Sequence, residues 1–159
     1  MTSTDALRAQ LASALDWADA HAPFEGVTED FPPNLRGVVP GGLPYSAWQL
    51  VEHMRRTQAD ILSFCVRKDY EELAWPADYW PDVEPPSESA WDECLAKFRQ
   101  DRAELQRLAR DPSIDLFEKV PAGSGQTYLR ELLLVADHNA YHLGQLVILR
   151  RLLRNWDPK

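Results

Sequence analysis

The fold of this chain is decided by residues 132–149, which read LLLVADHNAYHLGQLVIL. Apolar side chains occupy nearly every side of a helix drawn through this stretch, a pattern typical of a centrally placed helix. We expect the helix to begin after Thr127, whose hydroxyl can cap it, and to reach about Arg154. Its two histidines, His138 and His142, are four positions apart and therefore lie one above the other on one helix face.

Three further helices are predicted along the chain. Apolar residues at three- and four-residue steps place them at about residues 4–21, 46–68 and 87–110. Long connections rich in proline and glycine separate the helices, and no convincing period-2 alternation indicates a sheet. The sequence therefore predicts an all-α fold, a four-helix bundle, formed by a single domain of residues 1–159.

Local polar residues predict where two of these helices begin. Ser3 or Thr4 can cap the first helix. Ser46 can cap the second, and Gln49, three residues later, completes a capping box. We expect His21 to end the first helix, where an imidazolium favours the helix dipole, and to have a structural role.

Composition limits the partners that the protein can have. A length of 159 residues with 45% hydrophobic residues suffices for one buried core. The net charge of −8 argues against a nucleic-acid partner, which requires a basic surface. No apolar run approaches the roughly 18 residues needed to cross a bilayer, so no membrane contact is expected. The first residues lack the pattern of a signal peptide, and we expect a cytoplasmic location.

Histidine placement suggests a metal site. His53 lies at the flank of the apolar stripe of the second helix, and its own side of the helix is polar. Facing helices of a bundle can bring it to His138 and His142, giving three imidazole ligands and one open position. Three neutral imidazoles suit Zn²⁺, and Ni²⁺ or Fe²⁺ also fit. The spacing of four also arises by chance, and histidines bonded to backbone or carboxylate groups remain an alternative.

Two segments carry a resemblance to a known family. Residues 46–54 read SAWQLVEHM and residues 137–145 read DHNAYHLGQ. Together they resemble the DinB/YfiT-like superfamily, and the resemblance extends over essentially the whole chain. It implies a four-helix bundle of down-up-up-down topology with one long crossover, in which His53, His138 and His142 hold a divalent metal. Homodimers are common in this family, so the resemblance also implies a homodimer.

The same resemblance implies a class of reaction. Characterised branches of the family include thiol-dependent S-transferases that use bacillithiol, mycothiol or glutathione, and a mycothiol-dependent maleylpyruvate isomerase. We therefore expect a metal-dependent enzyme that transfers a low-molecular-weight thiol to a small electrophilic substrate. Metal-dependent hydrolysis and a non-catalytic metal- or ligand-binding bundle are the alternatives.

Helix geometry also places four other polar residues relative to the histidines. Glu131 and Asp60 share helical lines with His138 and His53, so each is a supporting carboxylate, a proton relay, or an ordinary capping-region or surface carboxylate. Gln145 is placed to line the cavity. Asp137 points about 100° away from the adjacent histidine and is not expected to be a ligand.

The remaining sequence features are tryptophans and cysteines. The tryptophans either form the walls of an electrophile pocket or pack beneath the proline-rich connections. The cysteines are expected to be reduced, buried thiols. The residues concerned are Trp48, Trp75, Trp80, Trp91, Cys65 and Cys94.

Overall fold

A computed structural model describes residues 2–156 of the chain. Its α-helices are α1 (Ser3–Ala14), α2 (Phe24–Thr28), α3 (Ala47–Val66), α4 (Ala90–Arg110) and α5 (Tyr128–Leu152), and a short 3₁₀ helix spans Pro33–Leu35. The only β-bridge among the described residues is the isolated Lys119–Thr127 pair. The predicted all-α class is confirmed. Residue 1 and residues 157–159 of the predicted domain lie outside the described residues.

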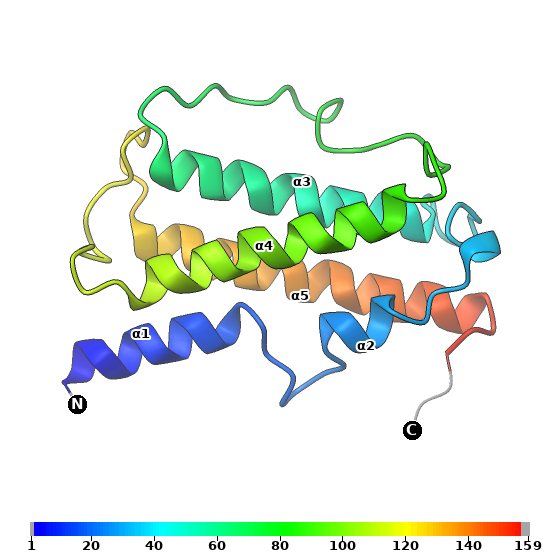
Figure 1. The fold of residues 1–159 in the computed structure, drawn as a ribbon, viewed down its shortest axis with the longest axis horizontal. Helices are drawn as coiled ribbons and strands as arrows, with labels where there is room; N and C mark the ends of the chain where they lie inside the picture. The colour runs from blue at the N-terminus through cyan, green and yellow to red at the C-terminus, as the bar shows by residue number, and fades with distance from the viewer. Residues whose placement is uncertain (1, 157–159) are drawn as a thin grey trace.

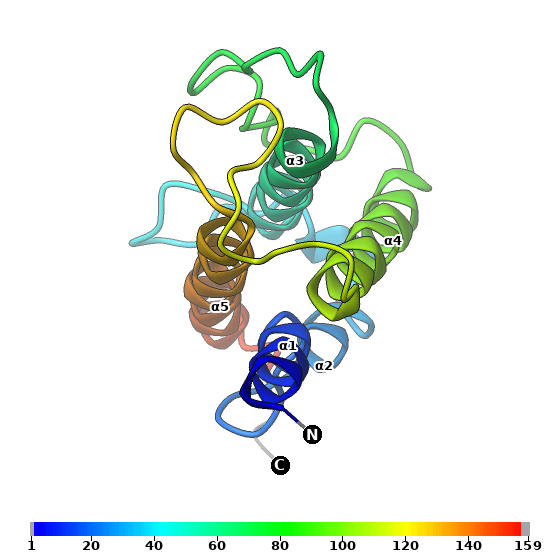
Figure 2. The ribbon, with the colours of Figure 1, turned by 90° about the vertical axis from the view of Figure 1, so that its left-hand side faces the viewer.

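The four longer helices pack side by side (Figures 1 and 2). α3 packs against α4 and α5, and α1 packs against the same two helices from the other side. Figure 1 shows α1 and α5 running in one direction and α3 and α4 in the opposite direction. Since α3 and α4 are parallel, the connection of residues 67–89 must run back along the length of α3 before α4 begins.

The helix starts confirm two predicted caps. The Ser46 hydroxyl accepts a hydrogen bond from the Gln49 backbone N–H, and the Gln49 side chain accepts one from the Ser46 N–H. Thr127 caps α5 through a bond from the Arg130 N–H. The ends of α3, α4 and α5 lie within about three residues of the predicted boundaries, as expected for fraying helix termini.

The predicted first helix is wrong in its cap and its length. The cap is Thr2, which exchanges side-chain and backbone hydrogen bonds with Asp5, in place of Ser3 or Thr4. α1 ends at Ala14, because Asp16 leaves the helical path and forms an ion pair with Arg102 of α4. His21 therefore does not end a helix; it lies exposed in the connection that leads to α2, a short helix that the sequence did not predict.

The apolar α5 is not buried on every side. Its inner face contributes to the core, whereas large apolar side chains on its outer face are about half exposed. The large apolar side chains of this outer face, called here the apolar face of α5, are Leu133, Tyr141, Ile148 and Leu152.

Two buried amides tie three helices together at the level of the histidines. Gln58 of α3 donates to the Phe98 carbonyl of α4 at 2.8 Å, and Asn139 of α5 donates to the Gln58 side-chain oxygen at 2.9 Å. Since Asn139 follows His138 directly, this chain of hydrogen bonds helps to fix α5 against α3 where the two helices present their histidines.

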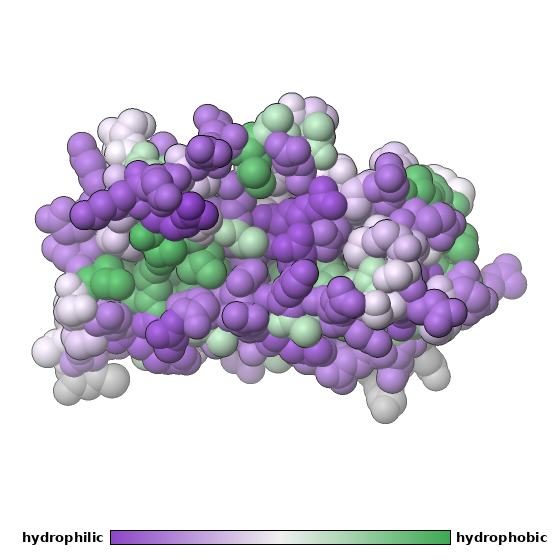
Figure 3. Space-filling model, turned by 45° about the horizontal axis from the view of Figure 1, so that its top comes forward, coloured by the Kyte–Doolittle hydropathy of each residue, from purple (hydrophilic) through white to green (hydrophobic). Residues whose placement is uncertain are grey.

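The connection of residues 67–89 is held to α3 by polar contacts. The Gln49 amide donates to the Pro81 carbonyl, and the Ser46 hydroxyl donates to the Val83 carbonyl. Figure 3 shows that the face carrying α3, α4 and this connection is largely hydrophilic, with hydrophobic side chains visible in a few separate groups. No helix among residues 2–156 is long and apolar enough to cross a membrane.

Candidate metal centre

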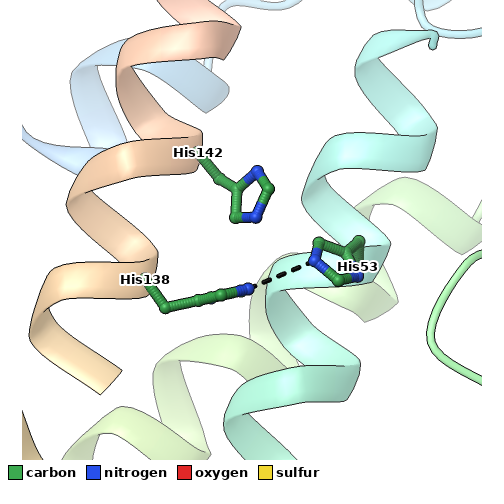
Figure 4. A group of neighbouring side chains, drawn as sticks. All are labelled: His53, His138 and His142. Carbon is green, nitrogen blue, oxygen red and sulfur yellow. Dashed lines mark hydrogen bonds between the residues drawn. The ribbon is translucent and has the colours of Figure 1, made fainter. Parts of the chain in front are cut away.

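The structure brings the three predicted ligands together. His53 lies in the second turn of α3, counted from the Ser46 cap, and His138 and His142 lie near the middle of α5. Figure 4 shows both α5 side chains pointing toward His53 across the interface between the two helices. One ligand nitrogen from each ring lies within 4.8 Å of the other two, so the cluster can hold a metal ion.

The closest pair of rings has a spacing that suits a shared cation. The Nε2 atoms of His53 and His138 are 3.1 Å apart. Metal–nitrogen bonds of about 2.0–2.1 Å separate two ligand nitrogens by about 2.9 Å at a right angle and by about 3.3 Å at a tetrahedral angle. Two imidazole lone pairs repel each other at this distance unless a proton or a cation lies between them. The observed spacing therefore fits a metal ligand pair.

A backbone group fixes the orientation of His53. Its Nδ1 atom lies 3.1 Å from the Tyr79 carbonyl oxygen. A carbonyl only accepts hydrogen bonds, so Nδ1 carries the proton and Nε2 keeps its lone pair. The Trp80 ring stacks on the His53 ring with a centroid distance of 4.0 Å and an interplanar angle of 6°. Both contacts come from the connection between α3 and α4, and together they direct Nε2 toward α5.

His142 is oriented in the same way by a residue of its own helix. Its Nδ1 atom lies 2.7 Å from the side-chain oxygen of Gln145. With the amide oxygen facing the ring, Nδ1 donates the hydrogen bond and Nε2 is left free. Gln145, which the sequence places at the cavity, thus supports a candidate ligand. A hydrogen bond of this kind on the remote ring nitrogen is typical of metal-binding histidines.

Burial keeps the three rings neutral. It lowers the pKa of His53 to about 4, against an opposing effect of the Tyr79 carbonyl, and the neighbouring His142 lowers this pKa further. Burial also lowers the pKa of His138 to about 4, with the other two rings contributing in the same direction. The pKa of His142 is lowered too, again mainly by burial. At neutral pH all three imidazoles therefore carry lone pairs, the form that binds divalent metals.

Aromatic side chains surround the cluster. Trp80 lies against His53 and, edge-on, against His142. Trp75 meets the His53 ring with a centroid distance of 6.4 Å, and Tyr141 meets His142 at 4.9 Å. Trp75 and Tyr141 are 70% and 64% exposed, so their rings lie where the cluster faces solvent.

The other two tryptophans of the sequence hypothesis do not border the cluster. Trp48 and Trp91 are buried within the apolar core between the helices. The pair in the connection therefore contacts the histidine cluster, and the pair on the helices forms part of the core. Whether Trp75 and Trp80 form the walls of an electrophile pocket stays a prediction.

The two carboxylates suggested as proton relays are engaged elsewhere. Glu131 is buried and accepts a hydrogen bond from Arg130. Asp60 accepts hydrogen bonds from the hydroxyls of Tyr70 and Tyr79. Asp137 is exposed on α5, in agreement with the expectation that it is no ligand.

Sequence reasoning missed the Tyr79 carbonyl and the Tyr141 ring. A backbone carbonyl has no side-chain signature, so only the path of the connection reveals that it meets His53. Tyr141 does carry a signal, because it stands beside His142 within the segment DHNAYHLGQ.

The chain was compared with protein families, curated proteins and solved structures, and one family matches. Neither a curated protein nor a solved structure matches the chain. The family model of the DinB superfamily matches residues 5–146, which include the whole of α3 and all three clustered histidines. Together with the all-α fold and the histidine cluster between α3 and α5, this match over most of the sequence shows that the chain belongs to the DinB superfamily.

Proposed function

We propose that this protein is a divalent-metal-dependent enzyme that transfers a low-molecular-weight thiol to small electrophilic molecules. The observation that carries the proposal is the convergence of three imidazole nitrogens from His53, His138 and His142 within 4.8 Å. The hydrogen bonds on the remote nitrogens of two of these rings support metal binding. Membership of the DinB superfamily supports it as well.

The donor set favours Zn²⁺ and also suits Ni²⁺ or Fe²⁺. Imidazole is a ligand for all three ions, and three protein ligands are typical of catalytic zinc sites. When bound, such an ion would supply the Lewis acidity that lowers the pKa of a thiol to near neutral. The rings of Trp75, Trp80 and Tyr141 would offer an apolar surface to the electrophile.

The protein's own thiols are unsuited to the reaction, which supports a thiol co-substrate. Cys65 and Cys94 are both fully buried. Burial raises the pKa of Cys65 to about 12 and also raises that of Cys94. Neither cysteine is therefore a nucleophile at neutral pH. In the proposed reaction the sulfur of the co-substrate forms a bond to the electrophilic carbon, its proton is released, and the leaving group departs with the bonding electrons.

Hydrolysis has less support at this site. It requires a group that takes a proton from water, and carboxylates commonly have this role. Asp60 and Glu131, the two carboxylates suggested by the sequence, are bonded to tyrosines and to an arginine instead of the histidines. A metal-binding bundle without catalysis is distinguished from the enzyme by the experiment below.

We also propose that the protein is one down-up-up-down bundle domain that forms a homodimer. The opposite directions of α1 and α5 against α3 and α4, and the long connection between α3 and α4, support this topology. The apolar face of α5 supports a dimer contact, since apolar patches on a surface are often interaction sites.

The metal is tested first. The protein is purified without a histidine tag, and its bound metal is measured by elemental analysis beside single alanine variants of His53, His138 and His142. We expect near-stoichiometric metal in the wild type and its loss in each variant. Unchanged metal content in the His53→Ala variant would sink the proposed site.

The reaction is tested next with the metal-loaded protein. It is incubated with bacillithiol, mycothiol or glutathione and with a chromogenic electrophile, and formation of the thioether is followed. Metal-dependent turnover with one thiol is the expected result. Turnover of an ester without any thiol indicates a hydrolase, and no turnover with a full metal complement indicates a binding protein.

A further inference from the structure

Asp60 joins two tyrosines of the long connection to α3. Its Oδ1 atom accepts a hydrogen bond of 2.9 Å from the Tyr70 hydroxyl, and its Oδ2 atom accepts one of 2.7 Å from the Tyr79 hydroxyl. Both carboxylate oxygens are thus used, and they bind residues that lie 10 and 19 positions further along the chain. Asp60 follows His53 by two helical turns and binds these tyrosines instead of the ring.

Tyr79 extends this contact to the candidate metal ligand. Its hydroxyl binds Asp60, and its backbone carbonyl accepts the hydrogen bond from the Nδ1 atom of His53 at 3.1 Å. The next residue, Trp80, stacks on the same imidazole ring. Tyr79 therefore connects the Asp60 carboxylate to Nδ1 of His53, the ring nitrogen that faces away from the cluster.

Side-chain contacts with α3 hold this part of the connection, which borders two surface cavities. A cavity of about 660 Å³ and another of about 500 Å³ lie on its two sides, and Asp60 and Tyr70 line both. Trp75, within the same segment, is 70% exposed. The Tyr70 ring packs edge-on against Phe64 of α3 with a centroid distance of 5.1 Å, and hydrogen bonds to Asp60 and from Arg56 to the Asp78 carbonyl also attach the segment to the helix.

The two hydroxyls remain donors over the physiological pH range. Desolvation, together with the hydrogen bond to Asp60, raises the pKa of Tyr70 to about 12 and also raises that of Tyr79. The direction of both hydrogen bonds is therefore unchanged over this pH range: each tyrosine hydroxyl donates and the Asp60 carboxylate accepts.

We propose that Asp60 is a positioning residue for the metal ligand His53 and acts through Tyr79. By holding the Tyr79 hydroxyl, it places the Tyr79 carbonyl against Nδ1, selects the Nδ1–H tautomer and leaves the Nε2 lone pair directed at the cluster. The inference rests on the proposed metal site for its functional meaning. The contacts themselves are made by the protein's own groups.

The experiment compares Tyr79→Phe and Asp60→Asn with the matched control Tyr70→Phe. Each tyrosine variant removes one hydroxyl from the same carboxylate, but only Tyr79 also contacts His53. Zinc affinity is measured by competition with a chromophoric chelator. The tautomer of His53 is read in the metal-free protein at neutral pH from the ¹⁵N shifts of its ring, and urea unfolding of each variant controls for stability.

We expect the zinc affinity of Tyr79→Phe and of Asp60→Asn to fall by about 10- to 100-fold, the usual cost of losing an outer contact of a metal ligand. In both variants the Nε2–H tautomer of His53 should appear. Tyr70→Phe should stay within about twofold of the wild type, with the Nδ1–H tautomer retained.

Two results would overturn the inference. One is an unchanged His53 tautomer in Tyr79→Phe. The other is a loss of zinc affinity in Tyr70→Phe as large as that in Tyr79→Phe, which would point to general loosening of the connection. Wild-type protein that binds no zinc would remove the proposed function. The tautomer measurement would still decide whether Asp60 positions His53, so the two failures are distinguishable.

Discussion

Thermal stabilisation by zinc gives the most direct test of the histidine cluster. The three rings are neutral at pH 7 and two of them already present Nε2, so zinc binding needs no proton release from an imidazolium. Zinc at one hundred times its dissociation constant stabilises the folded state by about 2.7 kcal/mol. At about 2–4 °C for each kcal/mol in a chain of this size, the melting temperature should rise by about 5–11 °C.

The assay is a melting curve by circular dichroism with and without zinc. It is recorded for the wild type, for His53→Ala and for His21→Ala. His21 is a matched control because it is the one histidine outside the cluster, exposed in the connection before α2. The zinc-dependent shift is compared instead of the melting temperature itself, since His53→Ala also removes the ring on which Trp80 stacks.

We expect the full shift in the wild type and in His21→Ala, and a shift near zero in His53→Ala. A His53→Ala protein that retains the shift would show that zinc binds elsewhere. Loss of the shift in His21→Ala would contradict the assignment of that histidine to an unrelated part of the surface.

Three further predictions follow from named contacts. The lowered pKa values of His53 and His138, about 4 against about 6.5 in an unfolded chain, mean that the unfolded state binds more protons between these values. The metal-free protein should therefore lose stability as the pH falls from about 6.5 to about 4, more steeply than a variant with both rings replaced by phenylalanine, as measured by urea unfolding. Gln145→Leu leaves the Nδ1–H of His142 without its acceptor and should weaken zinc binding by about tenfold in a calorimetric titration; an equal affinity would contradict the role of this amide. Ile148→Lys places a charge on the apolar face of α5 and should convert the proposed dimer to a monomer in analytical ultracentrifugation, so a dimer that persists would exclude this face as the contact.

Local sequence signals predicted those features of the fold that local chemistry determines. The caps at Ser46 and Thr127 were predicted because each depends on residues three positions apart. The length of α1 was not predicted correctly, since Asp16 lies outside the helix and pairs with Arg102, which is 86 positions away in the sequence. The exposure of the apolar face of α5 likewise depends on how many helices pack around it, which periodicity alone does not determine.

In the candidate site, too, the sequence predicted some features, and others depend on contacts between distant parts of the chain. The spacing of His138 and His142, with His53 on a facing helix, identified the three rings that lie together. The sequence also singled out Asp60 as a supporting carboxylate, a proton relay or a surface carboxylate. Its bonds to Tyr70 and Tyr79, and the contact of the Tyr79 backbone carbonyl with His53, carry no signal of their own in the sequence. A backbone carbonyl that contacts a histidine can be identified only when the path of the connection is known.

The parallel direction of α3 and α4 has a consequence for how this architecture diversifies. It obliges residues 67–89 to travel the length of the bundle, past His53. The helices supply the rings of the cluster, whereas the connection supplies Tyr79 and Trp80 around them. Mutation can therefore reshape the surroundings of the histidines by changing a segment that forms no helix, without disturbing the helical scaffold. The histidines and the groups that surround them are thus encoded in separate stretches of the same gene and can evolve at different rates.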